Sequence, residues 1–264
     1  MHVETFNTWS TIYEKSTGGV TRQVATHILP LLPPVTSTSV ILDNAAGPGI
    51  VASEILKSNY PPNIPIHLVD ASSAMISLAA NLFSSYPNVK CAVMPGEQLE
   101  FPDETFTHSI TNIGILVFKD GRKGAKEIWR TLKAGGVAVV TSWKRIGFAK
   151  PLAEACEAVR PGEKPFSLPI EKVWFEDGYL EGVMRGAGFG EVEMKVVVVG
   201  IEVGSLPLLF EAFRPEMIEA LVGWQEEEFE RLKVEFVKNG EQVAVPRGTG
   251  KVVEMCASIA VCRK

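Results

Sequence analysis

Short apolar stretches of the chain alternate with stretches of helical periodicity, and this alternation constrains the fold more than any other feature. The apolar stretches are apolar along most of their length, as in strands that are covered on both faces. Between them, apolar residues recur every three or four positions, which predicts amphipathic helices. Such alternation predicts a parallel sheet with helices on both faces. The expected strands are 39–43, 66–70, 89–94, 107–112 and 136–143, and the expected helices between them are 50–58, 73–86 and 119–132.

The regions before and after this core are less regular. Before it, apolar residues at helical spacing predict helices as far as the proline-rich run 29–34, because proline cannot continue a helix. After it, residues 144–175 combine prolines, glycines and aromatic rings, which predicts a loop with a short helix. Regular patterns then return as a helix at 176–186, a strand at 192–203, helices within 206–238 and a last strand at 252–262.

Together these patterns predict one α/β domain that comprises residues 1–264. Its sheet would be doubly wound, seven-stranded and mostly parallel, with helices on both faces. Residues 1–35 would form an N-terminal helical cover, and residues 144–175 a small cap after the fifth strand.

The charge balance and the cysteines exclude several classes of protein. The net charge is −5 and lysine and arginine form no dense cluster, so nucleic acid is not an expected partner. No apolar run is long enough for a membrane span or typical of a secretory signal. The four cysteines form no CxxC pair and have no metal-ligand spacing, which favours reduced thiols and no metal site. We therefore expect a cytoplasmic protein that acts on a small molecule, and the oligomeric state stays open.

The sharpest local signal is a glycine-containing loop between the first strand and its helix, with the sequence DNAAGPG at 43–49. Glycine permits a tight turn and a close approach to a ligand, and the helix that follows directs free N–H groups toward it. A plain strand–helix turn is one alternative. An NAD-linked oxidoreductase is another, because the run from Gly47 also fits G-x-G-x-x-A. The acid that ends the first strand and the long spacing to Asp70 weaken that alternative. Asp70 ends the second strand, where a carboxylate can accept both hydroxyls of a ribose.

The loop is the first of five motifs that resemble the class I S-adenosylmethionine-dependent methyltransferases in order and spacing. The resemblance covers roughly residues 39–200. Within this class the chain most resembles small methyltransferases of fungal secondary metabolism and quinone methyltransferases. It implies a Rossmann-like fold, S-adenosylmethionine as cofactor and S-adenosylhomocysteine as product. The motifs are VILDNAAGPG, IHLVDASSAM, LEFPDETFTHSI, WRTLKAGGVAVVTSW and GVMRGAGFGEVE.

The resemblance also implies roles for individual residues. The motif residues near the cofactor would be Asp43, Ala45, Gly47 and Gly49 at its methionine part, Asp70 at its ribose, Ala71 and Met75 beside its adenine, and Gly96 and Glu97 at the adenine edge. Asn112 would face the methyl-transfer site, and Tyr13 of the N-terminal helices would close over the cofactor, with Trp9 as an alternative.

Four positions depart from the family pattern. Ala45 replaces the first glycine of the loop, which is tolerable if its φ angle is negative. Pro95 stands where many relatives have an acid that binds the adenine amino group, so adenine recognition there would fall to backbone groups. Thr107 replaces an acid before the fourth strand, and Ala134 replaces a turn proline. None of these changes removes the cofactor site.

Few side chains are candidates for the chemistry, because the cofactor supplies the reactive methyl group. His108 is the one histidine near an expected active edge, and core packing is the alternative for it. An apolar acceptor pocket would be formed by Trp9, Trp143, Phe148, Phe166 and Trp174. We expect methylation of a small molecule, with oxygen favoured over nitrogen, sulfur or carbon. A non-methylating reaction on the same fold, such as a cyclisation, is the alternative.

Overall fold

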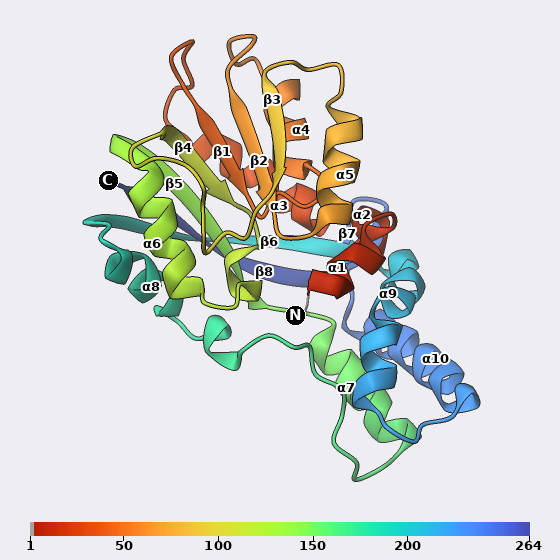
Figure 1. The fold of residues 1–264 in the computed structure, drawn as a ribbon. Coiled ribbons are helices and arrows are strands. Elements are labelled where there is room, and N and C mark those ends of the chain that lie inside the picture. Colours follow the sequence, from red (N-terminus) through yellow and green to blue (C-terminus); the bar gives the residue numbers. More distant parts are fainter. Residues whose placement is uncertain (1–2) are drawn as a thin grey trace.

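The computed structural model describes residues 3–264, apart from the side chain of Trp9. Its centre is an eight-stranded sheet with the order β3-β2-β1-β4-β5-β8-β6, in which β7 pairs with β8 (Figure 1). The strands from β3 to β5 in this order are parallel, whereas β8 is antiparallel to β5, β6 and β7. The bounds are β1 Ile41–Asn44, β2 Ile66–Asp70, β3 Val89–Val93, β4 Phe106–Thr111, β5 Leu132–Arg145, β6 Glu191–Glu202, β7 Val245–Arg247 and β8 Gly250–Arg263.

This sheet confirms the expected doubly wound, mostly parallel α/β fold and adds one strand to it. The additional strand, β7, has three residues and turns back onto β8 through Gly248, whose φ is +59°. A strand this short has no period-two pattern that could separate it from a loop. The structure also moves several predicted boundaries by one to four residues.

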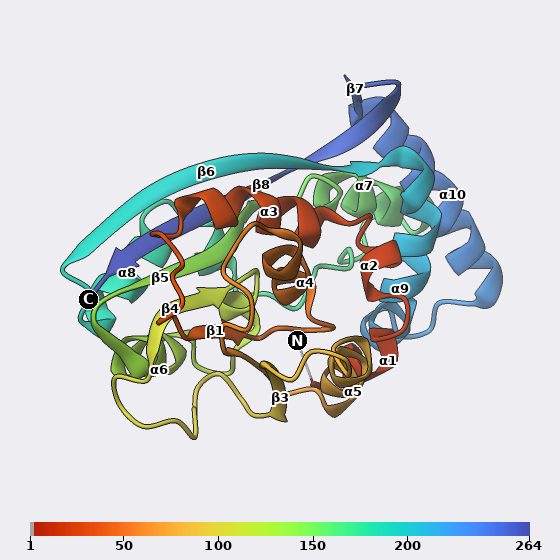
Figure 2. The same ribbon diagram turned by 90° about the horizontal axis from the view of Figure 1, so that it is seen from above.

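Helices cover both faces of the sheet because the chain leaves β1 in one direction and β4 in the other. From β1 it passes through α4 (Ile50–Lys57) and α5 (Ser73–Leu82), and from β4 through α6 (Gly121–Thr131). Right-handed crossovers then place α6 on the face opposite α4 and α5. Helix α3 (Val20–Ile28) packs on α4, and α8 (Tyr179–Ala187) packs on α6 (Figure 2).

Two helices, α5 and α6, have their N-termini capped by side chains. The Ser72 hydroxyl accepts a hydrogen bond from Met75 N at 3.1 Å and so caps the N-terminus of α5. Asp120 caps α6 in the same way, through a 2.9 Å bond from Lys123 N to its Oδ1. Helix α5 starts after a connection of two residues that follows β2, whereas α6 starts after a connection of nine residues that follows β4.

A group of helices lies beyond one end of the sheet (Figure 1). It contains α7 (Ala149–Val159), α9 (Leu206–Ala220) and α10 (Glu226–Val243), and α9 contacts α2 (Tyr13–Ser16), which follows α1 (Val3–Trp9). Single turns of 3-10 helix connect the larger elements, at Leu29–Leu31, Ile115–Val117, Lys172–Phe175 and Val203–Ser205. None of the helices described between residues 3 and 264 is long and apolar enough to cross a membrane.

The expected loop at 144–175 contains more helix than its prolines suggested. Pro151 lies in the first turn of α7, where a helix does not need the missing N–H group. Buried apolar residues at helical spacing continue from Leu152 to Val159. The segment is therefore a helix of 11 residues followed by an irregular stretch up to Lys172.

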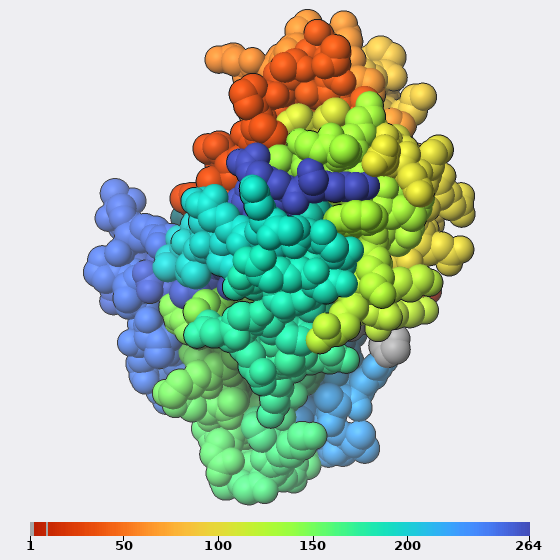
Figure 3. Space-filling model, turned by 90° about the vertical axis from the view of Figure 1, so that its left-hand side faces the viewer, coloured from red at the N-terminus to blue at the C-terminus, as the bar shows by residue number. Residues whose placement is uncertain are grey.

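Helix α8 and the edge strand β6 lie at the centre of the face seen in Figure 3, in teal to cyan. Along β6 exposed and buried side chains alternate, with Val196 and Val198 exposed and Val197 and Val199 buried. This period of two is that of a strand whose one face packs on the core and whose other face meets solvent.

Candidate functional site

Loops that follow parallel strands meet at one edge of the sheet. Strands β1, β2 and β4 are neighbours, and their paired residues run from Ile41 beside His108 and Ile66 to Asp43 beside Ile110 and Leu68. Their carboxyl ends therefore lie side by side. In open α/β sheets ligands bind outside such ends, where the strand order reverses.

The loop after β1 has an unusual backbone. Gly47 and Gly49 have φ angles of +55° and +88°, and a Cβ on Gly49 would clash with the ring of Phe83. Ala45 also has a positive φ, +56°, so it does not meet the condition of a negative angle under which alanine would replace glycine without strain. A left-handed alanine costs about 1–2 kcal/mol. The Cβ of Ala45 lies 2.5 Å from where a Cβ on Gly114 would stand, so Gly114 leaves room for it.

Asp70 connects this loop to the end of β2. Its Oδ2 accepts a hydrogen bond from Gly47 N at 2.9 Å, and its Oδ1 accepts one from Ser72 N at 2.8 Å. Burial raises the pKa of Asp70, and the two backbone bonds oppose that shift. A carboxylate oxygen has more than one lone pair, so each can accept a further hydrogen bond from a ligand hydroxyl.

Beneath the loop, two buried polar residues lack full hydrogen bonding. Asp43 Oδ2 accepts a bond from Ala52 N at 3.3 Å, but Oδ1 has no partner among the described residues. Both polar atoms of the Asn44 side chain likewise lack a partner in this part of the chain. Burial raises the pKa of Asp43 to about 8, and the nearby charge of Asp70 adds to the shift. Asp43 is therefore protonated at neutral pH.

A hollow of about 1240 Å³ opens above these residues. Asp43 and Gly49 lie behind its wall, whereas the other predicted cofactor residues line it, namely Tyr13, Ala45, Gly47, Asp70, Ala71, Met75, Gly96, Glu97 and Asn112. Exposed Pro95 lies in the wall beside Gly96. The carboxylate of Glu97 is already in use, because its Oε1 accepts a 2.5 Å bond from Lys119 N.

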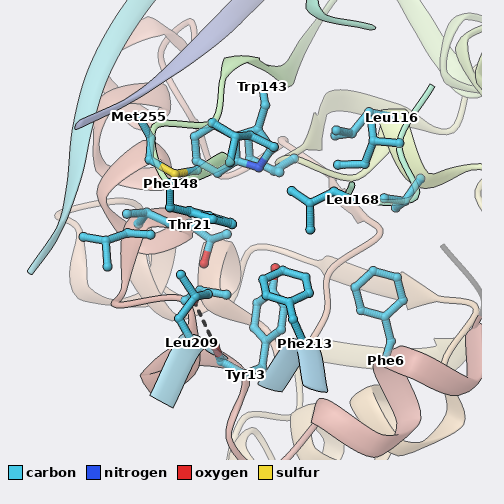
Figure 4. A pocket seen from close by; sticks show the side chains of 17 residues that line it. Phe6, Tyr13, Thr21, Leu116, Trp143, Phe148, Leu168, Leu209, Phe213 and Met255 are labelled. Atoms are coloured by element: carbon cyan, nitrogen blue, oxygen red, sulfur yellow. Dashed lines mark hydrogen bonds between the residues drawn. The ribbon is translucent and has the colours of Figure 1, made fainter. Parts of the chain in front are cut away.

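A second, apolar pocket of about 80 Å³ adjoins the hollow (Figure 4). Its walls come from α1, α2, α3 and α9, from strands β5, β6 and β8, and from the segments after β4 and β5. The two cavities share five residues, Phe6, Tyr13, Ile113, Leu116 and Val117. Other members of the wall are Trp143, Ile146, Phe148, Leu209, Phe213 and Met255. No acidic, basic or histidine side chain belongs to the described wall of this pocket.

A chain of hydrogen bonds holds the boundary between the two cavities. Ile113 N donates to Thr141 Oγ1 at 2.8 Å, and that hydroxyl donates to Asn112 Oδ1 at 3.1 Å. Asn112 Nδ2 in turn donates to the carbonyl of Thr21 in α3 at 2.9 Å. The φ of Ile113 is +54°, which is a genuine outlier for a β-branched residue. Strained backbone of this kind persists where the surroundings fix it, commonly at functional sites.

The structure corrects the expectation for His108. This residue lies at the start of β4, beside Ile41, and lines neither cavity. Its Nδ1 is hydrogen-bonded to the Thr107 hydroxyl at 2.8 Å, and its Nε2 to the Pro33 carbonyl at 3.3 Å. Burial lowers the pKa of His108. His108 is thus a core residue with both ring nitrogens in use.

The predicted acceptor aromatics separate into different places. Trp143 and Phe148 line the apolar pocket, whereas Trp174 lines the larger hollow. Phe166 is buried and lines neither cavity, so its assignment to the acceptor pocket was wrong. The side chain of Trp9 lies outside the described part of the structure.

Sequence reasoning missed the contributions of Phe6, Thr21, Ile113, Leu209 and Phe213 to the pocket. The last two come from α9, which lies far along the chain and carries no motif. Thr21 had a weak signal, because Tyr13, Thr17 and Thr21 follow one another at intervals of four.

Comparisons with known proteins agree with this geometry. Residues 41–136 match the family model described as a methyltransferase domain. The ubiquinone/menaquinone biosynthesis C-methyltransferase UbiE of Geobacter sulfurreducens is 36% identical over 103 residues, which are 38% of this chain and 40% of that protein. The chain thus spans less than half of that relative's length. Methyltransferase ucsB of Acremonium sp is 25% identical over 233 residues, 82% of this chain and 79% of that one.

A solved structure covers the whole chain. It is an S-adenosylmethionine-dependent methyltransferase, possibly a histamine N-methyltransferase by its description, from Thermotoga maritima, with a TM-score of 0.60, 17% identity and full coverage of both chains. At this identity the likeness shows the fold. Residues 41–136 are thus a methyltransferase domain, and the chain is similar in sequence and in fold to S-adenosylmethionine-dependent methyltransferases. This result removes the ground for an NAD-linked alternative.

The residues of the hollow fit the cofactor of this family, S-adenosylmethionine. The backbone at Gly47 has no Cβ that would block a close approach, and Asp70 offers acceptor oxygens for a ribose. The unpartnered atoms of Asp43 and Asn44 leave hydrogen-bonding capacity close to the same loop.

Asp70→Ala should weaken binding of S-adenosylhomocysteine by about tenfold to several-thousandfold, because two charge-assisted bonds are lost. The substitution should also lower the melting temperature, because Asp70 accepts hydrogen bonds from Gly47 N and Ser72 N in the protein itself. A residue that only bound the ligand would leave the melting temperature of the cofactor-free protein unchanged. Calorimetric titration and thermal unfolding measure the two effects. Asp103→Ala, at an exposed carboxylate outside the hollow, is the matched control and should change neither affinity nor loop stability. Unchanged affinity in folded Asp70→Ala protein would refute the ribose assignment.

Asp43→Asn should make the free energy of unfolding of the cofactor-free protein depend less on pH. The folded state keeps a proton on Asp43 up to about pH 8, whereas the unfolded chain loses it near 3.8. Rising pH across that window therefore favours the unfolded state, by at most about 1.4 kcal/mol per pH unit. Denaturant unfolding at several pH values should show a smaller decline for Asp43→Asn than for the parent. Glu219→Gln, at an exposed position, should keep the parental slope. Equal slopes for Asp43→Asn and the parent would contradict a protonated Asp43.

Proposed function

We propose that the protein transfers the methyl group of S-adenosylmethionine to an apolar small molecule, with oxygen as the methylated atom. The observation that carries this proposal is the junction between the two cavities. The hollow that fits the cofactor and the apolar pocket share Phe6, Tyr13, Ile113, Leu116 and Val117, so that occupants of both would meet there. Methyl transfer requires such alignment of acceptor and methyl group above all else.

The chain's own residues would act mainly by positioning. Asn112 and Thr141 fix the backbone at Ile113, on the wall that both ligands would touch. The aromatic and aliphatic lining would exclude water from the reaction. S-adenosylmethionine supplies an electrophilic methyl group when bound.

The proton of a hydroxyl acceptor sets a further requirement. Burial raises the pKa of Tyr13 to about 12, with a contribution from the charge of Asp70, so Tyr13 stays a neutral hydroxyl. The described wall of the apolar pocket holds no stronger base. A phenol or enol, whose hydroxyl loses its proton more readily than an alcohol does, suits such a pocket.

The cover over the acceptor would be built from three parts of the chain. Residues 1–35 supply Phe6, Tyr13 and Thr21, and the segment 144–175 supplies Phe148 and Leu168. Helix α9 supplies Leu209 and Phe213 and so extends the cover beyond the two expected segments. We regard all of these as parts of a single domain, 1–264, and the free thiols of its four cysteines support a cytoplasmic location.

Incubation with methyl-labelled S-adenosylmethionine and a panel of uncharged phenols, followed by mass spectrometry, tests the proposal. We expect a labelled methyl ether from at least one phenol, and less of it from Asp70→Ala. Cofactor binding without transfer to any phenol or to a metabolite extract would contradict the proposal. A change in the acceptor without methyl gain would instead support a non-methylating reaction such as a cyclisation.

A further inference from the structure

One hydroxyl in the apolar pocket has no hydrogen-bond partner. Thr21 is 5% exposed, and its Oγ1 lacks a partner among the residues that the structure describes. Figure 4 shows this oxygen and the Tyr13 hydroxyl within a wall of carbon atoms. A buried hydroxyl without a partner destabilises the folded protein, because it gives up its bonds to water.

Neighbouring Thr17 shows that such a hydroxyl can be satisfied within the fold. Thr17 lines the same pocket, but its Oγ1 donates to the Tyr13 carbonyl at 2.9 Å and lies 3.3 Å from that of Glu14. Thr21 lies on α3 one further interval of four along the chain, and its own carbonyl already accepts the bond from Asn112. The backbone of Thr21 therefore has a structural role that any residue could fill, whereas its hydroxyl has none in the protein alone.

The Tyr13 hydroxyl makes a second polar point beside the first. Thr21 acts on the pKa of Tyr13 as a side-chain hydrogen-bond partner and lowers it against the larger effect of burial, so the two hydroxyls lie close together, although no polar atom of the described structure lies within full hydrogen-bond distance of Thr21 Oγ1. A neutral phenol hydroxyl can donate a bond, and a threonine hydroxyl can both donate and accept. Two adjacent hydroxyls of this kind can both form hydrogen bonds with one oxygen atom of a ligand.

We propose that Thr21 and Tyr13 anchor a single hydroxyl or carbonyl oxygen of an uncharged, otherwise apolar acceptor. The proposal rests on the proposed function insofar as the apolar pocket is the acceptor's. Apart from Thr17, the indole N–H of Trp143 and the sulfur of Met255, the rest of the described lining is aliphatic and aromatic carbon. It holds no charge that would pair with an ammonium or a carboxylate. The anchor would determine which way round a flat apolar molecule lies, and so which of its atoms faces the cofactor hollow.

The test compares two probes that differ by one hydroxyl, 1-naphthol and naphthalene, bound to the full chain saturated with S-adenosylhomocysteine. Their affinities are measured by competition with a fluorescent apolar dye for the parent, Thr21→Val and Tyr13→Phe. We expect the preference for 1-naphthol over naphthalene to fall about three- to tenfold in each variant, as for the loss of one hydrogen bond. Naphthalene affinity should stay within about twofold of the parent, because valine and threonine have nearly the same shape.

Thr17→Val is the matched control, since it removes a hydroxyl from the same wall whose bonds are internal. It should keep the parental preference between the probes but lower the melting temperature. Thr21→Val should keep or raise the melting temperature, because an unsatisfied hydroxyl is removed. A parental probe preference in Thr21→Val, a fall in its melting temperature like that of Thr17→Val, or failure of both probes to bind the parent would each overturn the proposal. A lost preference in a protein that methylates no phenol would leave the anchor standing and refute only the proposed activity.

Discussion

The site depends on the two hydrogen bonds that the Asp70 carboxylate accepts from the backbone. One oxygen holds Gly47 N at 2.9 Å and the other holds Ser72 N at 2.8 Å, so a single side chain joins the ends of β1 and β2. The glycine loop keeps its left-handed turns beside this carboxylate, and Ser72 caps the helix that follows. The same oxygens retain lone pairs, so the group that shapes the loop can also accept hydrogen bonds from a ligand.

A second set of bonds connects this edge to the N-terminal helices. Asn112, at the end of β4, bonds the carbonyl of Thr21 on α3, and through Thr141 it supports the strained backbone of Ile113. Because Ile113 lines both cavities, the wall between the hollow and the apolar pocket is fixed by the sheet and by the helical cover together. Under the proposed function, this short network would link the positions of cofactor and acceptor.

The sequence was most informative where function constrains it locally. The alternating pattern predicted the sheet, and the motif residues around Gly47 and Asp70 lie together as expected. The errors arose where contacts between segments that are distant in the sequence determine which side chains reach the cavities. His108 lies near the amino end of β4, away from the carboxyl ends where the hollow opens, and Phe213 reaches the pocket from α9 only because that helix packs on α2. The positive φ of Ala45 depends on the space left by Gly114, nearly seventy residues away.

Amide hydrogen exchange of the full chain with and without S-adenosylhomocysteine tests most directly whether the strand-end loops and the N-terminal helices form one binding site. The account predicts slower exchange on binding in the loop 45–49, at residues 71–72 and 112–114, and in helices α2 and α3. The amides of α10, none of whose residues lines the hollow or the apolar pocket, should exchange at unchanged rates. Equal exchange of the loops and of α2 and α3 in both states would contradict the account.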